Sequence, residues 1–164
     1  MLPKRRSDFV ALALLAGCLP AGCLPPETPA APKPLVDADL AELAHAWNVS
    51  AHVVGTKTTI SEQDAVEMHG RTVTIGAGYT SPWHGSCEQA NRTKQTSSLV
   101  EITADVDLSP AGRATAKEFG LAKDVTEYKL TCATSPNTPP LTIYLTGKRA
   151  MTCFGGVCYL LTRN

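Results

Sequence analysis

The sequence predicts a mainly β domain of the α+β class, built as an antiparallel sheet or small open barrel with two or three short helices and stapled by disulfides. Strand-like segments outnumber helix-like ones and are joined by short turns rather than by regular crossover helices. The part of the chain from 36 to 164, about 130 residues, is long enough to bury one core. Four cysteines fall in this part.

The first predicted helix and strand lie at the start of this domain. Residues 37–46 carry leucines at helical spacing and predict a short helix. In residues 48–54 apolar and polar side chains alternate, which predicts a half-buried strand with Val49, Ala51 and Val53 on one face.

Two further segments have clear local signals. Ser61 and Asp64 stand at capping-box spacing before a short helix that Gly70 ends, and residues 71–75 then alternate as a strand. The strongest alternation in the chain covers 99–107 and predicts a strand with one face toward the core. The apolar residues of that face are Val100, Ile102, Ala104 and Val106.

The C-terminal part predicts one more helix and then only strands. Ser109 and a first-turn Pro110 begin a helix that should stop at Gly120. Three strand segments follow, at about 126–132, 141–146 and 148–163, the last folded back on itself at Gly155-Gly156. Both faces of this hairpin are apolar near its tip, so either it is covered on both sides, which we expect, or one apolar tip is left open for a partner.

The cysteines of the domain predict two disulfides. A two-residue Gly-Gly turn places Cys153 opposite Cys158 at a non-hydrogen-bonded site, with Cα atoms ~4.5 Å apart and within disulfide range. By remainder, Cys87 pairs with Cys132. A zinc site that uses these cysteines with His84 is the alternative, but no second close pair accompanies the Cys-x4-Cys spacing. We therefore predict no metal and no cofactor.

The most unusual local sequence covers residues 78–87. It offers Ser86 or Cys87 as a nucleophile with His84 as base, so a hydrolase using the 79–87 loop is one hypothesis. Neither a G-x-S-x-G elbow nor a papain-type motif is present, and we predict no catalytic residue. A binding loop, or a packed loop with Trp83 as a core plug, are the other interpretations. The predicted binding residues come from this loop and from the C-terminal hairpin: Tyr79, Trp83, His84, Phe154 and Tyr159.

The charge balance and the spacing of the histidines indicate which kinds of partner and ligand the sequence does not favour. The chain has 15 Lys+Arg and 15 Asp+Glu, with no run of like charges after the first eight residues, so nothing favours a nucleic-acid partner. The 4 histidines lack metal-ligand spacing such as His-x3-His.

The N-terminus has the layout of an export signal. Basic residues within 1–8 precede an apolar run over 9–16 that is too short to span a bilayer. The sequence Leu15-Ala16-Gly17-Cys18 resembles the lipobox of bacterial lipoproteins, in which the signal is cut before the Cys and that Cys is acylated. The resemblance implies a signal peptide over 1–17 and attachment of lipid such as palmitate at Cys18, with Cys23 as the alternative acceptor. An ordinary secretory signal, with both cysteines as thiols, is the other interpretation.

The residues around the lipobox also imply a location. Leu19 stands behind Cys18, which by the family's sorting rule implies the periplasmic face of the outer membrane of a Gram-negative bacterium, where acyl chains anchor the protein. Residues 18–35 hold six Pro between 19 and 34 and predict an extended tether. Residues 36–164 then form a single periplasmic domain.

This layout of lipobox, Pro-rich tether and small Cys-bonded β domain resembles small periplasmic inhibitor and immunity lipoproteins, which block cell-wall hydrolases. The resemblance implies a domain that is not an enzyme and binds a periplasmic or envelope protein. An envelope assembly or structural lipoprotein is the alternative function.

Overall fold

The computed structural model describes residues 37–121 and 124–164, which lie in one compact unit, Ala31–Asn164. The predicted signal peptide, both lipid-attachment cysteines and the tether lie outside these residues. No helix in the described part is long and apolar enough to cross a membrane. In chain order the elements are α1 (Asp37–Leu43), β1 (Ala46–Val54), α2 (Glu62–Glu67), β2 (Thr72–Ile75), β3 (Tyr79–Ser81), β4 (Gly85–Cys87), β5 (Ala90–Ser98), α3 (Leu99–Asp105), α4 (Pro110–Glu118), β6 (Asp124–Cys132), β7 (Leu141–Thr146), β8 (Arg149–Phe154) and β9 (Val157–Arg163).

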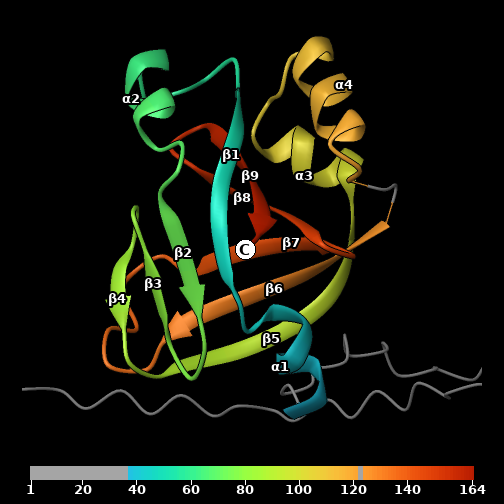
Figure 1. Cartoon of the computed structure of the whole chain (residues 1–164). Helices are drawn as coiled ribbons and strands as arrows, with labels where there is room; N and C mark the ends of the chain where they lie inside the picture. Colours follow the sequence, from blue (N-terminus) through green and yellow to red (C-terminus); the bar gives the residue numbers. More distant parts are fainter. Residues whose placement is uncertain (1–36, 122–123) are drawn as a thin grey trace, which may run out of the picture. The chain divides into compact units, whose positions relative to one another are not determined.

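The strands form one antiparallel sheet in the order β4-β3-β2-β1-β9-β8-β7-β6-β5 (Figure 1). This confirms the predicted mainly β fold with an antiparallel sheet and short helices. The helices predicted near 37–46, 61–70 and 110–120 and the C-terminal strands are also present.

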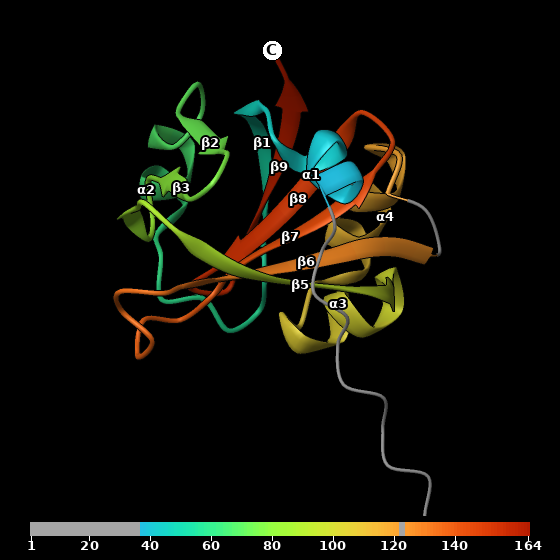
Figure 2. The same ribbon diagram turned by 90° about the horizontal axis from the view of Figure 1, so that it is seen from below.

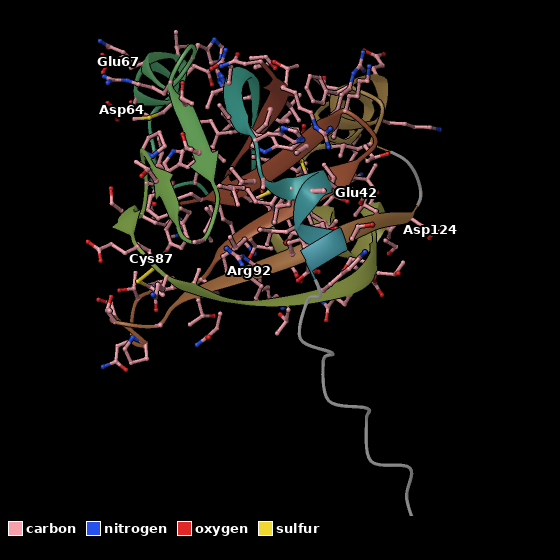
Figure 3. The ribbon with its side chains drawn as sticks, turned by 60° about the horizontal axis from the view of Figure 1, so that its bottom comes forward. Glu42, Asp64, Glu67, Cys87, Arg92 and Asp124 are labelled. Carbon is pink, nitrogen blue, oxygen red and sulfur yellow. A yellow bond between two sulfur atoms is a disulfide. The ribbon has the colours of Figure 1, made fainter. Side chains whose placement is uncertain are left out.

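The sheet curls because its two edge strands are consecutive in the chain. β4 and β5 lie at opposite edges, yet only residues 88–89 separate them, so the edges must meet at that corner (Figure 2). The Cys87–Cys132 disulfide, with Cα atoms 5.7 Å apart, joins β4 to β6 there. Arg92 on β5 donates a hydrogen bond to the Gly76 carbonyl between β2 and β3, so a second tie crosses the same corner (Figure 3).

Each face of the sheet has its own core. The inner core includes Trp47, Tyr128 and Tyr159, and the outer core, beneath α3 and α4, includes Met151 and Leu160. The β8–β9 hairpin belongs to both, since Tyr159 packs on one side and Met151 and Leu160 on the other, all buried. The expectation that this hairpin is covered on both sides is therefore confirmed for its strands.

The strand predicted over 99–107 is wrong, because the structure has α3 there. Ser98 and Glu101 form a reciprocal capping box: the Ser98 hydroxyl accepts from the Glu101 N–H at 3.2 Å, and the Glu101 carboxylate accepts from the Ser98 N–H at 3.0 Å. The Ser98 N–H and the Ser98 hydroxyl both donate to the Glu101 carboxylate, and these two bonds lower the pKa of Glu101. Ile102 is 3% exposed, whereas Val100, which the strand would have placed on the same face, is 71% exposed.

The prediction that Val49, Ala51 and Val53 share one face of β1 is wrong, because β1 contains a bulge. The pairing of β1 with β9 shifts register between Val49 and Ala51, so one extra residue enters the strand. Val49 consequently packs in the inner core, whereas Ala51 and Val53 pack in the outer one. The three residues do not share a face, although the strand itself was predicted.

Candidate functional site

The 78–87 segment folds as a tight hairpin of β3 and β4. Ser81 pairs with Gly85 across the turn, and the Ser81 hydroxyl accepts a hydrogen bond from the Trp83 N–H at 3.2 Å. Gly85 has a φ of 68°, a left-handed conformation that glycine adopts without strain. This turn carries Trp83 and His84 toward the tip of the β8–β9 hairpin.

Four predicted binding residues meet at that point, from segments about 70 residues apart in sequence. The rings of Trp83 and Tyr159 lie 4.5 Å apart, and those of His84 and Phe154 lie 5.3 Å apart, edge to face. Phe154 is 37% exposed and Tyr159 is fully buried, so the group has a packed base and an accessible rim. We name these four residues the aromatic cluster.

Tyr79, the fifth predicted binding residue, contributes to the inner core instead. It pairs with Cys87 on β4 and Ile75 on β2 and is 4% exposed. Burial raises the pKa of its hydroxyl. We therefore assign Tyr79 to packing rather than to the binding surface.

Three polar atoms in the aromatic cluster are buried without a hydrogen bond among the described residues: Trp83 Nε1, His84 Nδ1 and the Tyr159 hydroxyl. The Trp83 indole lies near enough to Tyr159 to lower the pKa of its hydroxyl, but burial acts more strongly and raises that pKa. Burial also lowers the pKa of His84, so its ring is neutral at pH 7. An unpaired buried polar atom costs about 1–3 kcal/mol, which a ligand group or an ordered water would relieve.

A histidine network adjoins the cluster. His52 Nδ1 lies 2.8 Å from His69 Nε2, and His52 Nε2 lies 2.9 Å from Glu62 Oε1. Because the carboxylate only accepts, His52 carries its proton on Nε2, and in its neutral form it accepts a hydrogen bond from His69 at Nδ1. The His52 ring is 6.5 Å from that of the buried Tyr159, so the network adjoins the packed base of the cluster rather than its rim.

Sequence analysis did not find this network. His52 lies on β1, whereas His69 and Glu62 lie at the two ends of the α2 region, and the separation of 17 residues between the histidines matches no local motif. The only available signal was that three titratable side chains flank one predicted strand-to-helix connection. Within the described ranges, no group of three or more His, Cys, Asp and Glu is arranged to hold a metal ion.

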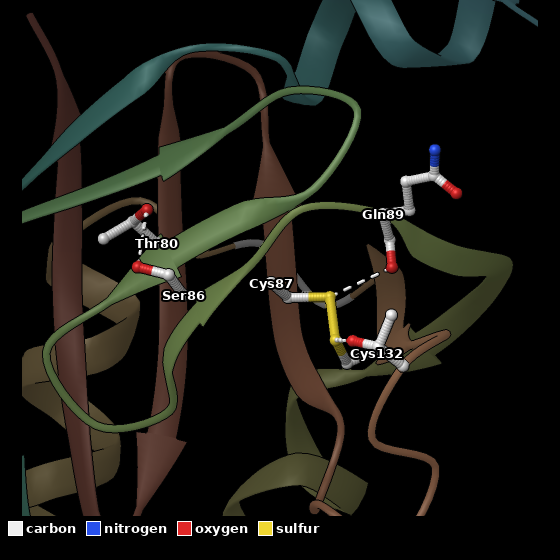
Figure 4. Close-up of a disulfide and its surroundings, with 6 residues drawn as sticks. Thr80, Ser86, Cys87, Gln89 and Cys132 are labelled. Carbon is white, nitrogen blue, oxygen red and sulfur yellow. Dashed lines mark hydrogen bonds between the residues drawn. A yellow bond between two sulfur atoms is a disulfide. The ribbon is translucent and has the colours of Figure 1, made fainter.

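The two nucleophiles of the hydrolase hypothesis, Ser86 and Cys87, both contact other residues (Figure 4). Cys87 is bonded to Cys132, so its sulfur is not a free thiolate. The Ser86 hydroxyl lies 3.3 Å from the Thr80 hydroxyl across the hairpin. The His84 ring contacts Phe154, and its Nδ1 makes no hydrogen bond among the described residues.

The structure contains two disulfides, which confirms that the domain is disulfide-bonded. Besides the Cys87–Cys132 bridge, Cys153 is bonded to Cys158 with Cα atoms 4.0 Å apart, and the two residues face each other in the β8–β9 register. Comparison of the chain with protein-family models, curated proteins and solved structures finds no match.

Proposed function

We propose that this chain is an exported lipoprotein, anchored by an acylated Cys18 to the periplasmic face of the outer membrane, whose β domain binds another protein and performs no chemistry. The observation that carries this proposal is the aromatic cluster, because it combines an exposed rim with a buried ring nitrogen, His84 Nδ1, that has no hydrogen-bond partner in the part of the chain that the structure describes. Aromatic side chains in such settings are the commonest anchors of protein interfaces.

The rim residue Phe154 stands on a rigid support. It precedes the Gly155-Gly156 turn and pairs with Val157 directly beyond the Cys153–Cys158 disulfide. The loop that follows β1 braces the turn from outside, since the Thr59 N–H donates to the Gly155 carbonyl at 2.9 Å. A tip already fixed in its bound shape loses little conformational entropy on association, which favours affinity.

A rigid aromatic tip suits a concave partner, such as the substrate cleft of an enzyme. We therefore propose inhibition of a cell-wall hydrolase as the molecular activity. Phe154 would enter the cleft, and His84, neutral at pH 7, would supply a hydrogen bond beside it. The acyl anchor would hold the inhibitor where cell-wall hydrolases act.

The test is a wall-clearing assay. The purified, oxidised full chain is titrated into peptidoglycan hydrolases of several cleavage types, with isolated cell wall as substrate. We expect stoichiometric inhibition of one type, and loss of about 2 kcal/mol, or roughly thirtyfold in inhibition constant, for Phe154→Ala. The matched control is Val66→Ala, since Val66 is 48% exposed on α2.

The outcomes separate the hypotheses. Inhibition that Phe154→Ala leaves unchanged would remove the aromatic cluster from the proposal. A stoichiometric complex with an envelope protein, without inhibition of any hydrolase, would instead favour the envelope assembly function. Hydrolysis by the chain itself that disappears in Ser86→Ala or His84→Ala would contradict a non-catalytic domain.

A further inference from the structure

A second candidate site lies between α3 and α4, on elements that do not contribute to the aromatic cluster. It is a groove of about 490 Å³, within the usual range for small-molecule sites. Its lining residues are Leu99, Val100, Thr103, Arg113, Lys117, Gly120 and Leu121. We refer to it as the α3–α4 groove.

The floor of the groove is apolar and its mouth is open. Val100 is the most exposed large hydrophobic side chain in the described part of the chain, at 71%. Leu121 is buried at the base of the groove. Thr103 is also buried, and its hydroxyl donates to the Val100 carbonyl at 3.1 Å, so the hydroxyl proton is not available to a ligand. An exposed valine beside other apolar side chains is a surface on which an alkyl chain gains free energy by leaving water.

The charged side chains that line the groove are both cationic. Arg113 and Lys117 lie one turn apart on the same side of α4, both are exposed, and no Asp or Glu is among the described residues that line the groove. Like charges at this spacing repel each other, and although Asp107 outside the groove offsets part of the Arg113 charge, an anion placed between Arg113 and Lys117 would relieve the remaining repulsion. Arg113 is held in place because its guanidinium donates to the Leu108 carbonyl.

We propose that the α3–α4 groove binds one fatty acid, with its alkyl chain along Val100 and Leu99 and its carboxylate between Arg113 and Lys117. The groove is formed by two short helices and has one apolar floor, which suits a single chain. An anionic group with one alkyl chain satisfies both the charge and the apolar floor. This site is independent of the proposed protein-binding function.

The test uses the full chain with Cys18→Ala and Cys23→Ala, so that no acyl group attached there competes. Dodecanoate is titrated by calorimetry below its micelle concentration, and dodecyltrimethylammonium serves as the probe of opposite charge. We expect one dodecanoate per chain and an affinity at least about tenfold weaker for the cation. Val100→Asp should weaken dodecanoate binding about tenfold, and Lys117→Glu about fivefold.

Controls separate binding from folding. Asp in the first turn of α3 suits the helix dipole, so Val100→Asp should fold as the parent does by circular dichroism. Val66→Asp and Arg71→Glu, both at exposed positions outside the groove, should bind dodecanoate like the parent. Absence of saturable binding, equal binding of the two probes, or an equal effect of Val66→Asp would overturn the proposal. So would a dimer that Val100→Asp converts to a monomer, because a second copy would then cover the groove.

Discussion

The Cys87–Cys132 disulfide should stabilise the domain about twice as much as the Cys153–Cys158 disulfide. The first joins residues 45 apart, and the second joins residues 5 apart. If a disulfide acts by reducing the entropy of the unfolded chain, these loop lengths give about 4 and about 2 kcal/mol. The perturbation is the replacement of each pair by alanine, which avoids placing a hydroxyl at buried positions such as Cys158.

Urea unfolding of the parent and of the two double variants, followed by circular dichroism, measures both effects. Removal of the Cys87–Cys132 disulfide should also increase the dependence of the unfolding free energy on urea concentration, because the unfolded chain exposes more surface without that bridge. If the Cys153–Cys158 pair contributes as much as or more than the other, loop entropy is not the main term. Loss of the Cys87–Cys132 bridge at a cost below about 1 kcal/mol would refute the same reasoning.

Three further predictions concern single residues. Ile102→Ala should destabilise the domain by about 3 kcal/mol in the same urea assay, because the Ile102 side chain is buried. Val100→Ala should change the stability by about 0.5 kcal/mol or less, because Val100 is exposed. Equal losses for the two variants would favour a strand over α3. Ser98→Ala should cost about 1 kcal/mol through loss of the α3 cap, and an unchanged urea midpoint would contradict the capping box. Burial lowers the pKa of His84 from 6.5, so the contribution of the neutral ring to stability is present above pH 6.5 and is lost as the pH falls through the folded-state pKa. His84→Gln should therefore flatten the plot of unfolding free energy against pH in this range. An unchanged slope would show that His84 is not the titrating group.

Local sequence patterns predicted most elements but could not decide between two periodicities at 99–107. An alternating segment of this length also places residues three and four apart on one helical face, and Leu99, Ile102 and Val106 fall on the face that packs in the outer core. The deciding signal was Ser98 followed by Glu101, a local capping pattern at the start of the segment. The alternation alone therefore led to the wrong prediction of a strand at 99–107.

Tertiary context decided what local patterns could not. β5 was not predicted because its sequence, ANRTKQTSS, is polar on both faces, and its position at an edge of the sheet explains why it needs little apolar surface. The contact of His52 with His69 depends on how α2 packs against β1 in three dimensions, and no sequence spacing predicts that packing. By contrast, Gly155-Gly156 predicted the tip of the β8–β9 hairpin, whereas the sequence predicted only a loop at 78–87 and not the β3–β4 hairpin that completes the aromatic cluster.

The tip of the β8–β9 hairpin shows why two glycines are needed there. Gly155 and Gly156 have φ values of 60° and 84°, the backbone of a tight turn that matches the twist of its strands. A Cβ at Gly155 would lie 2.6 Å from Ile60, and one at Gly156 would lie 2.5 Å from the Lys57 carbonyl, so the neighbouring loop packs directly on the turn. Turn geometry, loop packing and the Cys153–Cys158 disulfide therefore constrain the same few residues. Because three independent restraints hold the backbone beside Phe154, its partial exposure is a fixed property of the surface, as a preorganised contact residue requires.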